Sequence, residues 1–84
     1  MTRYLVLTMR NPEFQHTDLD AHYAYLQSLR ERNVIDMAGP FSDRSGGAYL
    51  LRVASFAEAK EIAFKDPLHL TGSSTVKVAE WSDA

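Results

Sequence analysis

Residues 17–33 read TDLDAHYAYLQSLRERN and make up the longest predicted helix of the chain. Leu19, Tyr23 and Leu26 recur at three- and four-residue spacing, so they form a narrow apolar stripe of the kind that packs on a sheet. His22 lies at the margin of this stripe, near the start of the helix. An imidazole in that position either packs with a hydrogen bond to a backbone carbonyl or takes part in acid/base chemistry, and the helix alone leaves both open.

Both ends of this helix carry terminal signals. Thr17 offers a hydroxyl N-cap, and Asp20 follows three residues later in a capping-box pattern. Arg30 and Arg32 place positive charge in the last turn, and Asn33 tolerates a left-handed conformation. The helix is therefore predicted to begin at Thr17 and to end at Asn33.

Four segments rich in β-branched, aromatic and aliphatic residues predict strands, namely Tyr4–Met9, Val34–Ala38, Ala48–Val53 and Thr75–Trp81. The first and third are largely apolar at both odd and even positions, which is typical of strands covered on both faces. Gly46 and Gly47 indicate a tight hairpin turn before the third strand, because glycine reaches positive φ freely. Lys77 and Glu80 indicate that the last strand is an outer one.

A second, shorter helix is predicted between the third and fourth strands. Ser55 and Glu58 form a capping box at its start, and the apolar pattern continues through Phe64. The pair Asp66-Pro67 ends the helix, because the residue before a proline is pushed out of the α region. Residues 69–74 are then expected to form a polar loop.

The predicted order of elements is strand, helix, strand, strand, helix, strand. This order fits an α+β fold of the ferredoxin-like βαββαβ type, in which a four-stranded antiparallel sheet carries two helices on one face, as a single domain over residues 1–84. The first and third strands are the central pair of such a sheet and are apolar on both faces, yet the helices cover only one face. We therefore expect a homodimer that is joined through the open face of the sheet.

The composition excludes several classes of function. A formal net charge of -2 gives no positive footprint for nucleic acid or for an anionic membrane surface. Cysteine is absent, so disulfides, thiolate nucleophiles and cysteine-based metal sites are excluded. No apolar run approaches the ~20 residues that cross a bilayer, and no secretory signal is recognisable, so a cytoplasmic protein is expected.

The chain has no strong catalytic motif, so a site has to be argued from isolated residues. His16 and His69 lie in predicted loops, where histidines are usually solvated, whereas His22 borders an apolar surface and is the better candidate for a general base. Asp66 either caps the turn that follows it or belongs to the site. Asp36 interrupts a strand, where carboxylates are depleted, and is either exposed to solvent or part of a site.

Two other kinds of site receive little support from the sequence. A metal site formed by His16, His22 and Asp18 or Asp20 is disfavoured, because a spacing of six does not bring the two histidines onto one helical face. We therefore expect neither a metal nor a cofactor. A hydrolase triad is not supported either, because the hydroxyl groups of the last predicted loop have no partner by spacing, at Thr71, Ser73 and Ser74.

Six short pieces of the chain occur in a specific order and spacing: His22-Tyr23-Ala24-Tyr25-Leu26, Ala38-Gly39-Pro40, Gly46-Gly47, Ser55-Phe56-Ala57-Glu58-Ala59, Asp66-Pro67 and Gly72. Together they make residues 4–81 resemble the YciI-like (YCII-related) family of small dimeric α/β proteins. The resemblance implies a dimeric α/β barrel and an active site formed by a histidine and an aspartate, which correspond to His22 and Asp66. The chain departs from the family in two places, with Leu68 in place of a usual phenylalanine and Leu19 in place of a frequent basic residue.

A histidine and aspartate pair fits a small acid/base enzyme of lyase or isomerase type, because elimination and isomerisation need proton transfer and no redox cofactor. The carboxylate would orient the imidazole, and His22 would move a proton on a small organic substrate. Tyr23, Tyr25 or Tyr49 would supply an aromatic wall or a phenol donor. Two alternatives stay open, a module that binds a small ligand without chemistry and a structural dimer module.

The simple fold also raises an objection to this pair. We expect both helices of this fold to run in the same direction, so His22 near the start of the first would lie far from Asp66 beyond the end of the second. Direct contact between the two side chains would then need a skewed first helix, a returning loop or a residue from the second subunit.

Overall fold

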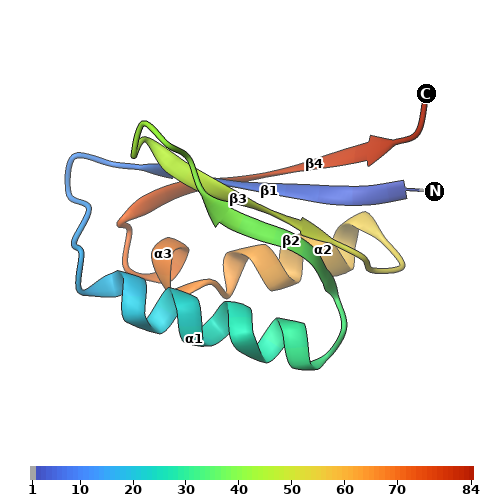
Figure 1. Cartoon of the computed structure of the whole chain (residues 1–84), viewed down its shortest axis with the longest axis horizontal. Coiled ribbons are helices and arrows are strands. Elements are labelled where there is room, and N and C mark those ends of the chain that lie inside the picture. Colours follow the sequence, from blue (N-terminus) through green and yellow to red (C-terminus); the bar gives the residue numbers. More distant parts are fainter. Residues whose placement is uncertain (1) are drawn as a thin grey trace.

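The computed structural model describes residues 2–84. Its elements in chain order are β1 (Thr2–Arg10), α1 (Asp18–Glu31), β2 (Ile35–Pro40), β3 (Gly46–Leu51), α2 (Phe56–Phe64), α3 (Pro67–Leu70) and β4 (Ser74–Ser82). The four strands form one antiparallel sheet in the order β2-β3-β1-β4, and the helices lie together on one face of it (Figure 1). This confirms the ferredoxin-like βαββαβ architecture, with β1 and β3 as the central pair. No helix within residues 2–84 is long and apolar enough to span a membrane.

The two long helices run in opposite directions, which corrects the expectation that they run the same way (Figure 1). The strands β1 and β3 are antiparallel neighbours, and each is followed by a helix that returns along its own strand. Opposite strand directions therefore give opposite helix directions. The start of α1 and the end of α2 lie at the same end of the sheet, so the objection to a contact between His22 and Asp66 disappears.

The core lies between the helices and the covered face of the sheet. Its buried apolar residues are Tyr4, Val6, Leu26, Leu29, Tyr49, Leu51, Ala59, Ile62, Ala63 and Val76. The sheet contributes alternate residues of β1 to this core, because Tyr4, Val6 and Thr8 are buried. Leu5 and Leu7 point to the open face and are only half-buried. The helices thus cover one face of the sheet, but the predicted stripe on α1 is only partly correct. The buried residues of α1 are His22, Leu26 and Leu29, whereas Tyr23 is 48% exposed.

The ends of the helices follow the predictions only in part. Asn33 takes the left-handed conformation with φ 59°, and the Ser55 hydroxyl accepts a hydrogen bond from the Glu58 amide at 3.1 Å, which confirms both signals. Thr17 stands at the N-cap of α1, but its side chain makes no capping hydrogen bond. Residues 69–74 are not all loop, because α3 occupies Pro67–Leu70.

The glycine pair has a different role from the one predicted. Gly46 and Gly47 are the first residues of β3, and the turn before them places Arg44 rather than a glycine at a positive φ of 63°. Glycine is required because the backbone is crowded here: a Cβ on Gly46 would lie 1.9 Å from the Thr8 carbonyl oxygen, and one on Gly47 would lie 2.7 Å from the Gly39 oxygen. The prediction of a glycine hairpin turn is therefore wrong, and the two glycines serve close packing of the strands.

Candidate active site

His22 and Asp66 are in direct contact within one chain. The Nδ1 atom of His22 lies 2.9 Å from Oδ1 and 2.9 Å from Oδ2 of Asp66. His22 projects from the second turn of α1, and Asp66 occupies the junction between α2 and α3. The contact needs neither a skewed helix nor a second subunit, because antiparallel helices already bring these two positions to the same end of the sheet.

Asp66 is completely buried, and three donors satisfy its carboxylate. The backbone amide of Leu68 donates to Oδ1 at 2.9 Å, which makes Asp66 the N-cap of α3, and the hydroxyl of Tyr49 donates to Oδ2 at 2.9 Å. Pro67 at the first position of α3 is compatible with this cap, because that position has no helical partner for an N–H. The two sequence interpretations of Asp66, as a cap and as the partner of His22, are therefore both correct.

The hydrogen bonds around Asp66 assign the tautomer of His22. The carboxylate already accepts from Tyr49 and Leu68, so the contact with the imidazole is assigned as Nδ1–H donating to the carboxylate. In the neutral ring, the proton on Nδ1 leaves Nε2 as an acceptor. No residue within 2–84 forms a hydrogen bond with Nε2, so this atom is free to take a proton from a ligand.

Tyr49 supports the pair from β3. Burial raises the pKa of its phenol far above the ordinary value, and the negative charge of Asp66 raises it further. Tyr49 therefore remains protonated and keeps donating to Asp66 under working conditions. This residue stood among three unranked tyrosines in the sequence prediction, and only the register of β3 against β1 places its hydroxyl at the carboxylate.

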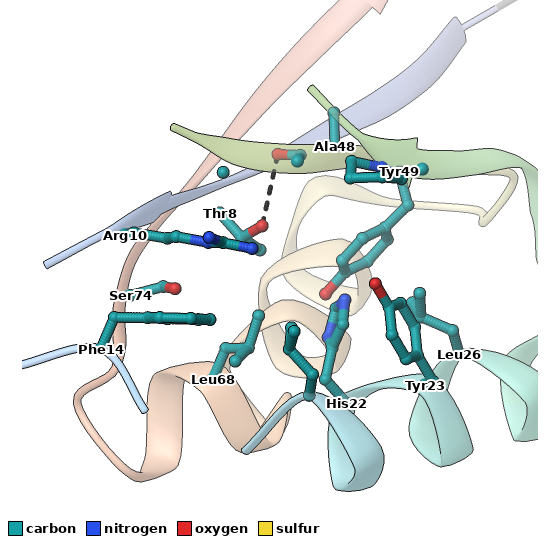
Figure 2. Close-up of a pocket in the computed structure, with 15 residues that line it drawn as sticks. Thr8, Arg10, Phe14, His22, Tyr23, Leu26, Ala48, Tyr49, Leu68 and Ser74 are labelled. Atoms are coloured by element: carbon teal, nitrogen blue, oxygen red, sulfur yellow. Dashed lines mark hydrogen bonds between the residues drawn. The ribbon is translucent and has the colours of Figure 1, made fainter. Parts of the chain in front are cut away.

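A cavity of about 30 Å³ lies beside His22, between α1 and the covered face of the sheet. Figure 2 shows His22 and Tyr23 rising from α1 toward Tyr49, while Arg10, Thr8 and Ser74 approach from the strands. The rest of the lining is mostly apolar and comes from Phe14, Leu19, Leu26, Gly39, Pro40, Gly46, Gly47, Ala48 and Leu68. A lining that is largely apolar with a few convergent polar groups is the kind found in small-molecule sites, and the cavity itself is small.

The other two tyrosines have separate places. Tyr23 lines the cavity, its ring centre lies 5.4 Å from that of His22, and its side chain is about half exposed. Tyr25 donates a hydrogen bond to the carbonyl of Ile62 at 2.7 Å and so ties α1 to α2 away from the cavity lining. Burial, followed by the charge of Asp66, raises the pKa of Tyr25. Tyr23 is thus the phenol that can reach a ligand directly.

The remaining sequence candidates do not join the site. His16 and His69 are exposed, and Asp36 forms ion pairs with Arg3 and with Arg52, the latter at 3.4 Å. Among residues 2–84, no group of three or more histidine, aspartate or glutamate residues is placed to hold a metal ion. The metal site considered from His16 and His22 is therefore not formed.

Three polar residues of the cavity were missed by sequence reasoning. Arg10 appeared to end a strand, Ser74 appeared to belong to a loop, and Thr8 appeared to be an ordinary strand residue. A signal for two of them was present, because Thr8 and Arg10 continue the alternation of Tyr4 and Val6, which are the buried positions of β1. Their parity alone places both side chains on the covered face.

Comparison with known families gives a match to the YCII-related domain over residues 2–82. The chain belongs to the YCII-related family. This YCII-related protein is 43% identical over 81 residues to the uncharacterised protein YjpA of Bacillus subtilis (strain 168), and the alignment covers 96% of this chain and 95% of YjpA. The family expected from the sequence is therefore confirmed.

Two solved structures share the fold of this YCII-related protein. One is the 5-chloro-2-hydroxyhydroquinone dehydrochlorinase TftG from Burkholderia phenoliruptrix AC1100 in complex with 2,5-dihydroxybenzoquinone, with a TM-score of 0.78 and 22% identity, covering 98% of this chain and 95% of TftG. The other is the hydroxynitrile lyase from Passiflora edulis, with a TM-score of 0.52 and 15% identity, covering 95% of this chain and 90% of that enzyme. At these identities the likeness establishes the fold alone.

Proposed function

We propose that this YCII-related protein is a cofactor-independent acid/base enzyme of lyase or isomerase type that acts on a small organic substrate. The observation that carries the proposal is the bond from Nδ1 of His22 to the buried carboxylate of Asp66, which leaves Nε2 free beside a cavity. Two relatives of the same fold have names that describe lyase-like reactions, a dehydrochlorinase and a hydroxynitrile lyase, and this supports the choice of reaction class.

Each of the three residues has a distinct part in the proposed chemistry. Nε2 of His22 takes a proton from the substrate and later returns one to the product or leaving group. The carboxylate of Asp66 orients the imidazole and stabilises the positive charge that appears on it. Tyr49 transfers no proton in this scheme. Its ring centre lies 6.2 Å from that of His22, and its hydroxyl holds the carboxylate in position. Asp66 and Tyr49 therefore act through His22.

The test compares two histidine variants of the purified protein against a panel of small hydroxylated, halogenated and cyano-substituted organic compounds. His22→Gln should lower kcat/KM for any compound that is turned over by about 10²- to 10⁴-fold, the usual contribution of a general acid or base. His69→Gln is the matched control, because His69 is exposed and lies outside the cavity lining. Circular dichroism of both variants checks that the fold is retained.

Turnover that is equal in His22→Gln and in the unaltered protein would refute the proposal. Compounds that bind beside His22 and are released unchanged would instead favour the alternative of a binding module. Asp66→Asn separates the roles further, because loss of the negative charge should lower the rate while the cap of α3 is partly kept.

We also propose that two copies of the chain pair through the open face of the sheet. This face carries large apolar side chains that no helix covers, with Met37 75% exposed and Trp81 59% exposed. Leu5 and Leu50 face each other across β1 and β3 and lie beside them in a second hollow of about 220 Å³. A second copy would cover this apolar surface. Because a chain of 84 residues can bury only a small core, the interface would also add stability.

The oligomeric state in solution tests the pairing. Light scattering on a sizing column should give twice the chain mass of 9.5 kDa, and Leu50→Lys, in the middle of the open face, should give the monomer. Phe64→Lys is the control, because Phe64 is 36% exposed and lies on α2, on the other side of the sheet. A monomer in the unaltered protein, or dissociation by both variants alike, would contradict a dimer through this face.

A further inference from the structure

Arg10 places an uncompensated positive charge in the cavity beside His22. It is the last residue of β1, and its guanidinium carbon lies 4.1 Å from the ring centre of Phe14 (Figure 2). Within residues 2–84 its guanidinium forms no hydrogen bond or ion pair, whereas Arg3 is paired with Asp36. The stacking on Phe14 holds the guanidinium plane and leaves its N–H donors available for an anion.

Ser74 is a second, independent sign of a ligand at the same place. It lies directly opposite Arg10 in the pairing of β1 with β4 and lines the same cavity. Its side-chain oxygen is buried, the residue is 4% exposed, and this hydroxyl has no hydrogen-bond partner within residues 2–84. Buried hydroxyls nearly always form a hydrogen bond, so an unpaired hydroxyl on a cavity wall indicates that a ligand supplies the missing partner.

The two groups together define the chemistry of the ligand. A guanidinium and a hydroxyl can both donate hydrogen bonds. A ligand group that accepts from both and neutralises the positive charge is an oxyanion, such as a carboxylate or a phosphate. No carboxylate lines the cavity to compete for Arg10, because Asp66 lies behind His22 and is already bonded to three donors.

The small volume of the cavity favours the smaller and flatter of the common anionic groups. A cavity needs roughly 10–15 Å³ to hold one water molecule, so about 30 Å³ corresponds to two or three waters, and the cavity is open on one side to the rest of a larger ligand. A carboxylate has three non-hydrogen atoms in a plane, and a phosphate has five in a tetrahedron. The carboxylate also matches the planar fork of arginine.

We propose that Arg10 and Ser74 form a carboxylate-binding subsite, and that the substrate class of this protein is therefore a small organic acid. The assignment of a substrate rests on the proposed acid/base function, whereas the binding of a carboxylate does not. In the complex, Arg10 neutralises the carboxylate and the Ser74 hydroxyl donates to one of its oxygens. Arg10 and Ser74 thus bind one end of the acid, and His22 faces the same cavity from α1.

The experiment is an NMR titration of the full-length protein with sodium acetate at constant ionic strength, followed through the side-chain resonances of Arg10 and His22. Acetamide, a neutral molecule of the same shape, and inorganic phosphate are titrated in parallel. Acetate should shift both side chains in a saturable way, while acetamide should bind at least tenfold more weakly. Saturable binding of phosphate without acetate binding would overturn the assignment to a carboxylate.

Three variants locate the site of acetate binding. Arg10→Met should weaken it at least tenfold, and Ser74→Ala should weaken it about three- to tenfold without disturbing the stacking on Phe14. Arg30→Met is the matched control, because it removes the same charge from an exposed position on α1 and should leave acetate binding unchanged. Equal weakening by Arg10→Met and Arg30→Met would mean nonspecific attraction and would overturn the subsite.

Failure of the subsite and failure of the acid/base function give different results. Acetate binding that depends on Arg10 and Ser74, in a protein whose turnover does not depend on His22, would leave the subsite standing and refute the enzyme. Turnover that depends on His22 but is indifferent to Arg10→Met would refute the subsite and leave the enzyme standing.

Discussion

The two ends of the covered face of the sheet are built from the same layers but have opposite chemistry. At one end, Leu29 of α1 and Leu51 of β3 are completely buried in a continuous apolar core. At the other end the same two elements bury polar groups, with His22 and Tyr49 bonded to Asp66. One end therefore contributes most of the packing energy, and the other holds a polar site that packing alone would not favour.

This difference shows how a short chain keeps a buried carboxylate. Each polar group at that end is held by an element whose apolar part is fixed elsewhere: α1 is anchored by Leu26 and Leu29, and β3 by Leu51. The hydrogen bonds from Tyr49 and from the Leu68 amide compensate for the loss of water around Asp66. We expect damage at the apolar end to appear as lost stability and damage at the polar end to appear first as lost function.

The largest expected effect is on the apolar end. Leu29→Ala should lower the free energy of unfolding by about 3 kcal/mol, because a completely buried leucine leaves a cavity. Leu19→Ala on the same helix should lower it by less than about 1 kcal/mol, because Leu19 is only half-buried and lines the existing cavity. Urea unfolding measures both values, and equal losses would mean that the two ends do not differ in packing.

An intermediate effect is expected at the polar end at alkaline pH. The pKa of Tyr49 is raised by burial and by Asp66, so its protonated form is favoured in the folded state. This contribution to stability is fully present below the unfolded-state pKa of about 10 and is lost as the pH rises above it, at up to about 1.4 kcal/mol per pH unit. Tyr49→Phe should remove this part of the slope of the unfolding free energy against pH.

Stability measured between pH 9 and 11 tests this expectation. Tyr25→Phe is the comparison, because Tyr25 is only half-buried and donates to a backbone carbonyl rather than to the carboxylate. It should remove a smaller part of the slope than Tyr49→Phe does. If the slopes of the unaltered protein and of Tyr49→Phe coincide, Tyr49 does not stay protonated in the folded state and its role at Asp66 is wrong.

The sequence predicted the fold well because that information is local and periodic. Runs of β-branched, aromatic and aliphatic residues predicted the strands, three- and four-residue spacing predicted α1, and Ser55 and Asn33 marked ends that the structure confirms. The short helix α3 was missed because its four residues carry no period, and Asp66 was expected to cap a turn rather than a helix. The directions of the helices were wrong because they follow from the pairing of β1 with β3, which joins residues far apart in the chain.

The site was predictable only in its central pair. The family resemblance singled out His22 and Asp66, and the structure brings them together. Arg10 was overlooked although its parity on β1 places it on the covered face. Ser74 was not found, because its meaning depends on a cross-strand register and on an unpaired hydroxyl, and neither leaves a signal in a single sequence. Sequence reasoning also treated capping by Asp66 and pairing with His22 as alternatives, whereas one carboxylate has enough acceptor positions for both.

The smallest expected effect compares two neighbouring serines at the polar end. Ser73 and Ser74 are both buried, but the Ser73 hydroxyl is bonded to the carboxylate of Asp18, while the Ser74 hydroxyl is unpaired. Ser74→Ala should therefore raise the free energy of unfolding by up to about 1 kcal/mol, and Ser73→Ala should lower it by about 1–2 kcal/mol. Thermal and urea unfolding without added carboxylate measure both. If Ser74→Ala is more stable and binds acetate more weakly, this hydroxyl serves a ligand and destabilises the fold. If Ser74→Ala is less stable, the hydroxyl forms a hydrogen bond within the free protein and is not a ligand-binding group.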